Sequence, residues 1–193
     1  LPAYTNYTVA AGINALTVTG LLPLTTYYYR VRANGPGCVL NSGTITVTTT
    51  CGFYTIPYLQ NFDTTTVGTL PNCFTVFNGN ADAQTWSVQT TTFSSAPRSV
   101  LINANPTLDM NDWLMSPGLN LTGGISYRLI FRYKTGTTGS EAENLTVYYG
   151  GAPTVAGMTN ILTNLNGINN SFFETITIDF TPATAFSPPI ALI

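Results

Sequence analysis

The segment Tyr-Arg-Leu-Ile-Phe-Arg-Tyr, residues 127–133, indicates the fold class of this chain. Leu129, Phe131 and Tyr133 take alternate positions in it, which is the pattern of a strand that buries one face and exposes the other. Residues 145–149 repeat the same alternation of large side chains. Both segments therefore favour sheet over helix, because helical burial recurs every three or four residues.

The composition of the remaining chain agrees with a β fold. Thr, Tyr, Val, Ile and Phe are frequent, and these residues suit pleated, half-buried strands. Clusters of Gly, Asn, Pro and Ser recur roughly every ten residues, as turns do in β-sandwiches. The 193 residues are 44% hydrophobic and 12% aromatic, so the chain can build a core and disorder is excluded. We therefore predict an all-β protein.

Charged residues are scarce, and this excludes several functions. They make up 7% of the chain, whereas a typical soluble domain carries about 25%. The net charge of −2 and the pI near 4.7 leave no basic surface for nucleic acid. The chain has no histidine, which excludes an imidazole general base and a His-ligated zinc. No apolar run approaches the ~18 residues of a membrane span.

The first fifty residues carry a recognisable motif. Residues 21–31 follow the pattern L-x-P-x-T-x-Y-x-Y-x-V. This pattern resembles the corner and following strand near the end of a fibronectin type III domain. The resemblance implies that Tyr27 is a tyrosine-corner residue, with its ring in the core and its hydroxyl bonded to nearby backbone. Residues 1–50 are therefore expected to be the C-terminal part of such a domain, with the earlier strands missing.

The rest of the chain, residues 51–193, carries a second series of motifs. In order they are Pro57-Tyr58-x-x-x-Phe62-Asp63, Leu70-Pro71-x-Cys73-Phe74, Trp86, Asn111-Asp112-Trp113-Leu114-Met115-Ser116-Pro117, Leu129-x-Phe131-x-Tyr133 and Glu143-x-Leu145-x-Val147. The series resembles the choice-of-anchor J and cleaved-adhesin domains of Bacteroidota surface proteins, which are relatives of MAM-type modules. The resemblance implies a jelly-roll β-sandwich. Phe74 departs from the pattern, since the family usually has Trp there, and residues 189–193 resemble a penultimate strand, so this module is also expected to be truncated.

The pattern of apolar residues predicts the elements. In the first module, strands are expected at residues 16–19, 27–33 and 44–50, with Ile45 and Val47 facing inward. In the second, the expected strands are residues 54–62, 74–77, 85–88, 99–102, 113–115, 127–133, 144–149 and 172–180. Residues 155–165 are expected to form one short helix. Trp86 and Trp113 lie on strands and are expected to fill the core.

The three cysteines, Cys38, Cys51 and Cys73, leave two interpretations open. None forms a CxxC pair, and no histidine can complete a zinc set. They are either buried free thiols, or Cys51 and Cys73 form a disulfide and Cys38 is left over.

Carboxylates and amides gather in turns of the second module. Calcium takes six to eight oxygen ligands, and residues 78–82 and 105–112 are rich in such oxygens. The resemblance to cleaved-adhesin domains implies bound calcium, with acidic positions of the motif falling on five residues. These candidate ligands are Asp63, Asp82, Asp109, Asp112 and Glu143. The alternative is that they are ordinary turn residues, because Asp and Asn favour turns for local hydrogen bonding.

No set of residues has the pattern of a catalytic site. The carboxylates are scattered along the chain, and without histidine a serine triad is excluded. Enzyme activity is therefore not expected. A deep cleft with two facing carboxylates would be needed to support the hypothesis of an enzyme.

The resemblances imply a non-catalytic adhesion or spacer segment of a large secreted, cell-surface bacterial protein. Such proteins are commonly exported by type IX secretion, which makes an extracellular glycan or surface protein and the secretion and anchoring machinery of the outer membrane the expected partners. A carbohydrate-binding accessory module of a secreted hydrolase or peptidase is the alternative, because exposed aromatic residues can stack on sugar rings.

Overall fold

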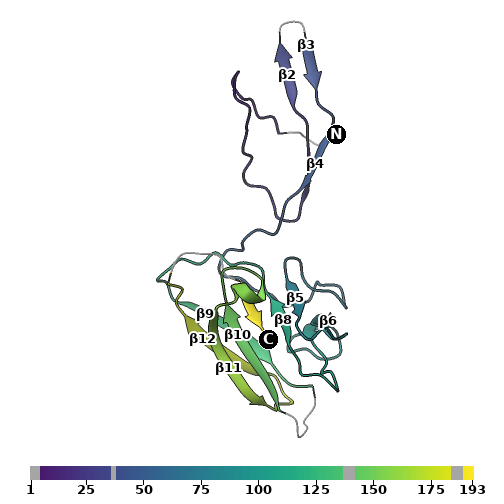
Figure 1. The fold of residues 1–193 in the computed structure, drawn as a ribbon, viewed down its shortest axis with the longest axis vertical. Coiled ribbons are helices and arrows are strands. Elements are labelled where there is room, and N and C mark those ends of the chain that lie inside the picture. The colour runs from purple at the N-terminus through teal and green to yellow at the C-terminus, as the bar shows by residue number, and fades with distance from the viewer. Residues whose placement is uncertain (1–4, 36–37, 137–141, 184–188) are drawn as a thin grey trace. The chain divides into compact units, whose positions relative to one another are not determined.

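The computed structural model describes residues 5–35, 38–136, 142–183 and 189–193 (Figure 1). The chain divides into two compact units, Leu1–Thr50 and Cys51–Ile193. Thirteen strands and one short 3-10 helix are the regular elements of the described residues, which confirms the all-β prediction. Among these residues, no helix has the length and hydropathy that crossing a membrane requires.

The first unit consists of two antiparallel strand pairs. Strand β1 (Thr26–Tyr29) pairs with β4 (Ile45–Thr48), and β2 (Arg32–Gly35) pairs with β3 (Cys38–Asn41). The prediction of a strand at residues 16–19 is wrong, because that segment has no strand partner. Ile45 and Val47 were expected to face a core, but they are 40% and 45% exposed. In the described part of this unit, β1 and β4 form a sheet of two strands, so the pair alone cannot cover its own side chains.

A tyrosine corner fixes the entry to β1. The backbone N–H of Leu22 donates a hydrogen bond of 2.9 Å to the hydroxyl of Tyr27, as the resemblance implied, but the Tyr27 ring is half-buried and is not in a core. The second unit has the same tyrosine corner at the same spacing, which was not predicted from the sequence. There the backbone N–H of Thr122 donates to the hydroxyl of Tyr127 over 2.8 Å.

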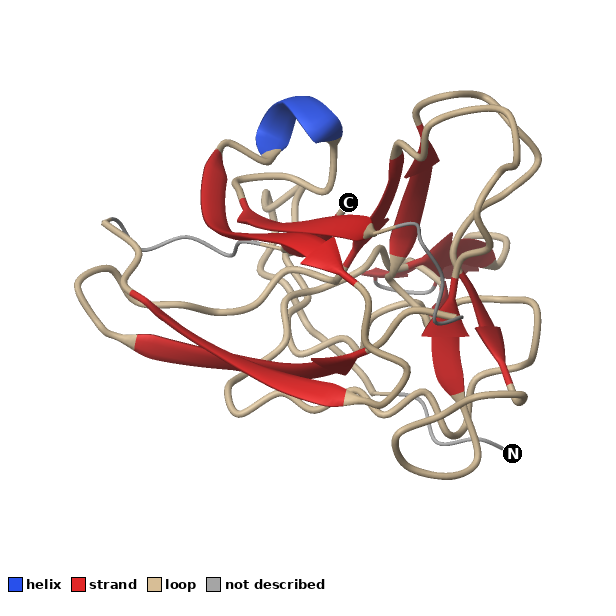
Figure 2. Cartoon of the chain, turned by 90° about the horizontal axis from the view of Figure 1, so that it is seen from below, coloured by secondary structure: helices blue, strands red, loops and turns tan. Residues whose placement is uncertain are grey.

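The second unit is built from two facing sheets and a hairpin (Figure 2). The larger sheet has the order β11-β10-β13-β8-β5, the smaller pairs β12 with β9, and β6 pairs with β7. The strands are β5 (Thr75–Asn78), β6 (Ser87–Gln89), β7 (Ser99–Leu101), β8 (Asp112–Met115), β9 (Tyr127–Tyr133), β10 (Glu143–Tyr149), β11 (Asn160–Ile168), β12 (Glu174–Phe180) and β13 (Ile190–Leu192). The predicted strand near the C-terminus is therefore present, between β10 and β8.

The core lies between the two sheets. Val147 and Ile190 of the larger sheet pack with Leu129 and Phe131 of β9. This confirms that the alternation in residues 127–133 marks a strand with one face in the core. Trp113 is 6% exposed and belongs to a second cluster, which confirms it as a core residue.

Two predicted elements of this unit are wrong. Residues 54–62 contain one isolated bridge, Tyr54 with Leu119, and no strand, because Pro57 has no N–H to donate to a ladder. The helix expected at residues 155–165 is a single 3-10 turn, η1 (Val155–Gly157). The following residues enter β11 and pair with β10, so tertiary pairing overrides the local pattern.

Candidate metal centre

Strands β5 and β8 bring a carboxylate and an amide side by side. Asn78 is the last residue of β5 and lies opposite Asp112, the first residue of β8. All four residues of β8 are buried, and the strand has a neighbour on each side, β13 and β5. Asp112 is carried inside with them and is 3% exposed.

The turn after β5 folds back over the start of β8. Its Gly79 N–H donates to the backbone oxygen of Asn111 over 2.7 Å. A Cβ at this position would lie 2.6 Å from the same oxygen, so only glycine permits the approach. The Nδ2 atom of Asn78 donates to the backbone oxygens of Asp82 (2.6 Å) and Gln84 (3.1 Å), which closes the turn.

Asp82 accepts hydrogen bonds at both carboxylate oxygens. Its Oδ1 accepts from the Gln84 N–H (2.7 Å), and its Oδ2 accepts from Asn105 Nδ2 (2.8 Å) and Asn80 Nδ2 (3.2 Å). Burial acts to raise the pKa of Asp82, but these donors, together with Asn78, outweigh it, so the pKa is lowered. Asp82 is therefore held as a carboxylate anion.

Asp112 has the opposite environment. Within the described residues, both of its carboxylate oxygens and the Oδ1 atom of Asn78 are buried without a hydrogen-bond partner. Burial raises the pKa of Asp112 and the negative charge of Asp82 raises it further, and together they outweigh the lowering effect of the Asn111 backbone N–H. Three buried oxygens that lack donors are costly, since buried acceptors normally find partners. A hard cation such as Ca²⁺ satisfies oxygens of this kind, so the donor set fits the calcium that the sequence analysis expected.

The other three predicted ligands lie elsewhere. The side chain of Asp109 is exposed, and its backbone oxygen accepts from Asn80 Nδ2 over 2.8 Å. Asp63 accepts from Asn61 Nδ2 over 2.6 Å, and its Oδ1 is buried without a partner in the described residues. Glu143 is exposed and paired in register with Ile168 at the start of β10.

The five predicted ligands therefore do not form one carboxylate cage. Among the described residues, no three Asp, Glu, Cys or His side chains converge in a way that would hold a metal. What the structure brings together is Asp82 and Asp112 with the amides of Asn78 and Asn105. The amide-rich turns were visible in the sequence, but nothing in it showed which amides face the carboxylates.

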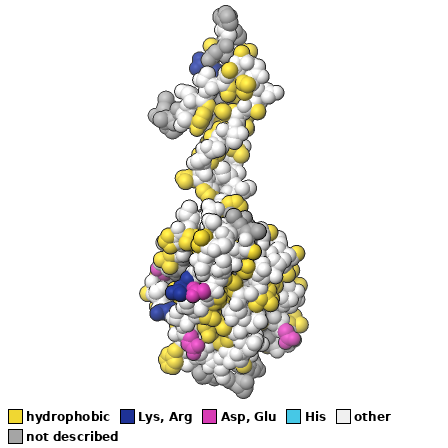
Figure 3. Space-filling view, turned by 90° about the vertical axis from the view of Figure 1, so that its left-hand side faces the viewer, with side chains coloured by type: hydrophobic (Ala, Val, Ile, Leu, Met, Phe, Trp, Pro, Cys, Tyr) yellow, Lys and Arg dark blue, Asp and Glu magenta, His cyan; other side chains and the backbone are white. Residues whose placement is uncertain are grey.

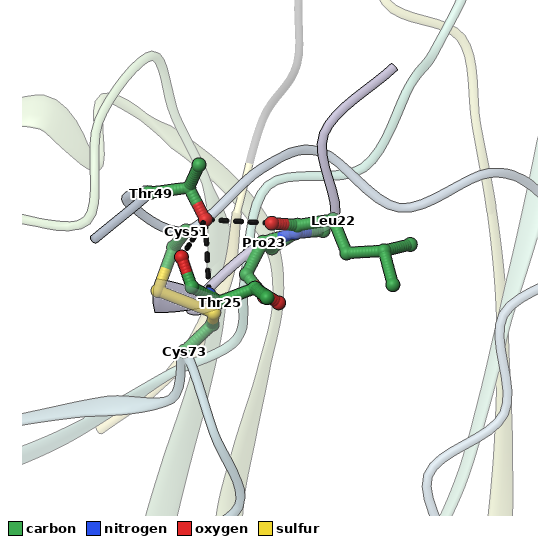
Figure 4. The surroundings of a disulfide bond; sticks show 6 residues. All are labelled: Leu22, Pro23, Thr25, Thr49, Cys51 and Cys73. Carbon is green, nitrogen blue, oxygen red and sulfur yellow. Dashed lines mark hydrogen bonds between the residues drawn. A yellow bond between two sulfur atoms is a disulfide. The ribbon is translucent and has the colours of Figure 1, made fainter. Parts of the chain in front are cut away.

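A disulfide joins Cys51 to Cys73, with their Cα atoms 5.6 Å apart (Figure 4). It closes a loop at the start of the second unit. In the same view, Thr49 Oγ1 donates to the backbone oxygen of Leu22 (2.6 Å) and accepts from the Thr25 N–H (3.0 Å). The side chain of Cys38 lies outside the described residues.

Several solved structures resemble this chain, and two of them are cleaved adhesin domains with a TM-score above 0.5. The K1 cleaved adhesin domain of Lys-gingipain from Porphyromonas gingivalis W83 aligns with a TM-score of 0.52 and 16% identity, over 65% of this chain and 82% of that domain. The K2 cleaved adhesin domain of Lys-gingipain gives 0.54 and 15%, over 70% and 87%. The chain shares the fold of these domains. No protein-family model matches it, and no curated protein does.

The likeness concerns mainly the second unit. The first unit ends at Thr50, so an alignment over 65% of 193 residues has to extend well beyond it. The predicted fold class, an all-β sandwich, is thereby confirmed. At 15–16% identity the likeness shows the fold alone, and a function has to be argued from the residues of this chain.

Proposed function

We propose that this chain is a non-catalytic adhesion or binding segment of a large secreted, cell-surface bacterial protein. Its fold likeness to cleaved adhesin domains supports this role. The surface is consistent with it, because Figure 3 shows few charged side chains on a face made mostly of uncharged atoms. The extracellular location, the type IX secretion route and the surface partners belong to the same proposal.

In this proposal the second unit holds Ca²⁺ between Asn78, Asp82 and Asp112. The observation that carries the site is the set of three buried oxygens without donors on Asn78 and Asp112. Carboxylate and amide oxygens are the ligands that calcium prefers, and its flexible coordination accepts a mixed set. Bound there, the ion would tie the turn after β5 to the start of β8 and so stabilise the sandwich.

Thermal unfolding with and without calcium tests the site. A ligand present at 100 times its Kd stabilises the folded state by about 2.7 kcal/mol. For a domain of this size that corresponds to a rise in Tm of roughly 5–10 °C. We expect EDTA to lower the Tm of the full chain and added Ca²⁺ to restore it, while Mg²⁺ restores little. An unchanged melt would refute the calcium site.

Surface exposure is tested separately. Antibodies raised against this chain are expected to label intact cells of the producing bacterium, and labelling that requires permeabilised cells would refute the location. Loss of labelling on disruption of type IX secretion would support the export route, whereas unchanged labelling would refute that part.

Carbohydrate binding is the second candidate function. The observation that favours it is a cavity of about 600 Å³ in the second unit, lined by tyrosine, threonine and amide side chains.

A further inference from the structure

The cavity lies within the loop that the disulfide closes. Its lining comes from two stretches, residues 54–60 and 64–72, and every lining residue falls between Cys51 and Cys73. We name it the tyrosine–threonine pocket, after Tyr54, Tyr58 and its four threonines. Its volume of about 600 Å³ is within the range of ligand sites for small molecules.

Polar groups in the pocket are left without internal partners. Within the described residues, no side-chain hydrogen bond is made by the hydroxyls of Tyr54, Tyr58 and Thr66 or by the amides of Gln60 and Asn72. These groups line one concave surface. They therefore offer several donors and acceptors to whatever enters the pocket.

Two aromatic rings form part of the wall. Tyr54 and Tyr58 meet edge to face, with ring centroids 5.2 Å apart and an interplanar angle of 63°. Both rings are partly buried against the core and partly open. An amphipathic wall of this kind suits a ligand that has apolar C–H faces and polar edges.

The backbone around the pocket is held in place on several sides. The Tyr54 N–H donates to the Gly118 oxygen (2.9 Å), which fixes one wall. Arg98 donates through Nη1 to the backbone oxygen of Thr65 and holds the second. The second stretch ends at Asn72, next to Cys73 of the disulfide. A preformed site of this kind loses little conformational entropy when a ligand binds.

No lining residue is charged. An ionic ligand would give up water without gaining a counter-charge, and a wholly apolar ligand would leave the hydroxyls and amides unpaired. A neutral sugar meets both requirements, since it presents many hydroxyls and one or two apolar faces. We infer that the tyrosine–threonine pocket binds a neutral glycan.

This inference rests on the binding role proposed above and names the class of ligand. It is independent of the calcium site, because Asn78, Asp82 and Asp112 do not line the pocket. Failure of glycan binding would leave the calcium-dependent melt and the labelling of cells untouched, so the proposals fail separately.

The test applies the full chain to an array of neutral oligosaccharides of hexoses, pentoses and N-acetylhexosamines, with sialylated and sulfated counterparts of each. We expect binding to neutral members and weaker binding to their acidic counterparts. The strongest neutral glycan is then titrated by calorimetry. An array with no neutral hit, or with acidic hits only, would overturn the inference.

Substitutions then locate the site. Tyr58→Phe removes one hydroxyl and is expected to weaken binding about threefold to tenfold, and Tyr58→Ala more than tenfold. Thr66→Val is expected to weaken it severalfold, and its exposed side chain has no internal partner whose loss would unfold the chain. The matched control is Thr177→Val on β12, an exposed threonine far along the chain from the pocket, with no expected effect. If Tyr58→Phe and Thr66→Val bind like the unmodified chain, the pocket is not the site.

Discussion

Asn78 and Asp112 lie opposite each other on β5 and β8, and neither the Asp112 carboxylate nor the Asn78 amide oxygen receives a hydrogen bond from the described residues. Strand register holds the two residues side by side, with Asp112 buried. Neutralising Asp112 should lower the Tm if the carboxylate binds a cation, and should leave the Tm unchanged or raise it if the carboxylate is buried without one.

Asp112→Asn separates these two cases. If Ca²⁺ binds, the variant should lose the calcium-dependent part of its Tm, about 5–10 °C, because one anionic ligand is gone. In EDTA it should melt at or above the unmodified chain, because a buried charge without donors has been removed. Melts of both proteins with and without Ca²⁺ give the measurement.

Asp109→Asn is the matched control. It makes the same chemical change at an exposed side chain that contributes only its backbone oxygen to the cluster. Its Tm should keep the full calcium dependence. A calcium response that survives in Asp112→Asn, or disappears in Asp109→Asn, would contradict the assignment.

The sequence predicted the candidate site only in outline. The runs of Asn and Asp at residues 78–82 and 105–112 marked the right turns, because such residues cluster where backbone turns need side-chain partners. Which of them face each other depends on the β5–β8 register, which no local pattern encodes. Glu143 matched the motif equally well, yet it pairs with Ile168 at the start of β10 and is not part of the cluster around Asp112.

Tyr127→Phe should destabilise the second unit by about 1 kcal/mol, because the N–H of Thr122 loses its acceptor. Urea unfolding followed by tryptophan fluorescence is the measurement, and it reports on this unit because Trp86 and Trp113 both lie there. Tyr54→Phe makes the same change where the hydroxyl has no partner in the described residues, so its midpoint should barely move. Equal effects of the two substitutions would argue against a structural role for this corner.

Opening the Cys51–Cys73 disulfide should cost about 3 kcal/mol, since the two residues are 22 positions apart in sequence and the bond restricts the unfolded chain. The variant with both cysteines changed to serine should therefore unfold at lower urea. Intact mass should also rise by about 2 Da on reduction, because a disulfide lacks two hydrogens. A mass that does not change with reductant would show that the bond is absent.

Tyr58 should titrate later than an ordinary tyrosine. Burial raises its pKa from 10.0 to about 12, and the neighbouring Tyr54 adds to the shift. A raised pKa means that the folded state favours the neutral phenol, so the associated stability is complete below pH 10 and is lost as the pH rises toward 12. Tyrosinate absorbance should show a late phase, and Tyr58→Phe should reduce it, the remainder belonging to Tyr133, whose pKa burial also raises. A titration without that phase would contradict the burial of this ring.

The fold was more predictable than the site, and the failures have physical causes. Alternation identified β9 and β10, because each has one face in the core. Residues 160–165 were expected in a helix, but they belong to β11. That strand is stabilised by its pairing with β10, which a local sequence pattern does not encode. Residues 54–62 have strand-like composition, but Pro57 prevents a ladder.

The position of the disulfide has a mechanical consequence. Cys51 is the first residue of the second unit, and Cys73 immediately precedes Phe74 at the entry to β5. Tension applied to the chain before Cys51 passes through the sulfur–sulfur bond to Cys73 and leaves the enclosed loop slack. All residues that line the tyrosine–threonine pocket belong to that loop. A ligand held there would be shielded from shear along the polypeptide, and reduction would place the pocket directly in the path of the pulling force.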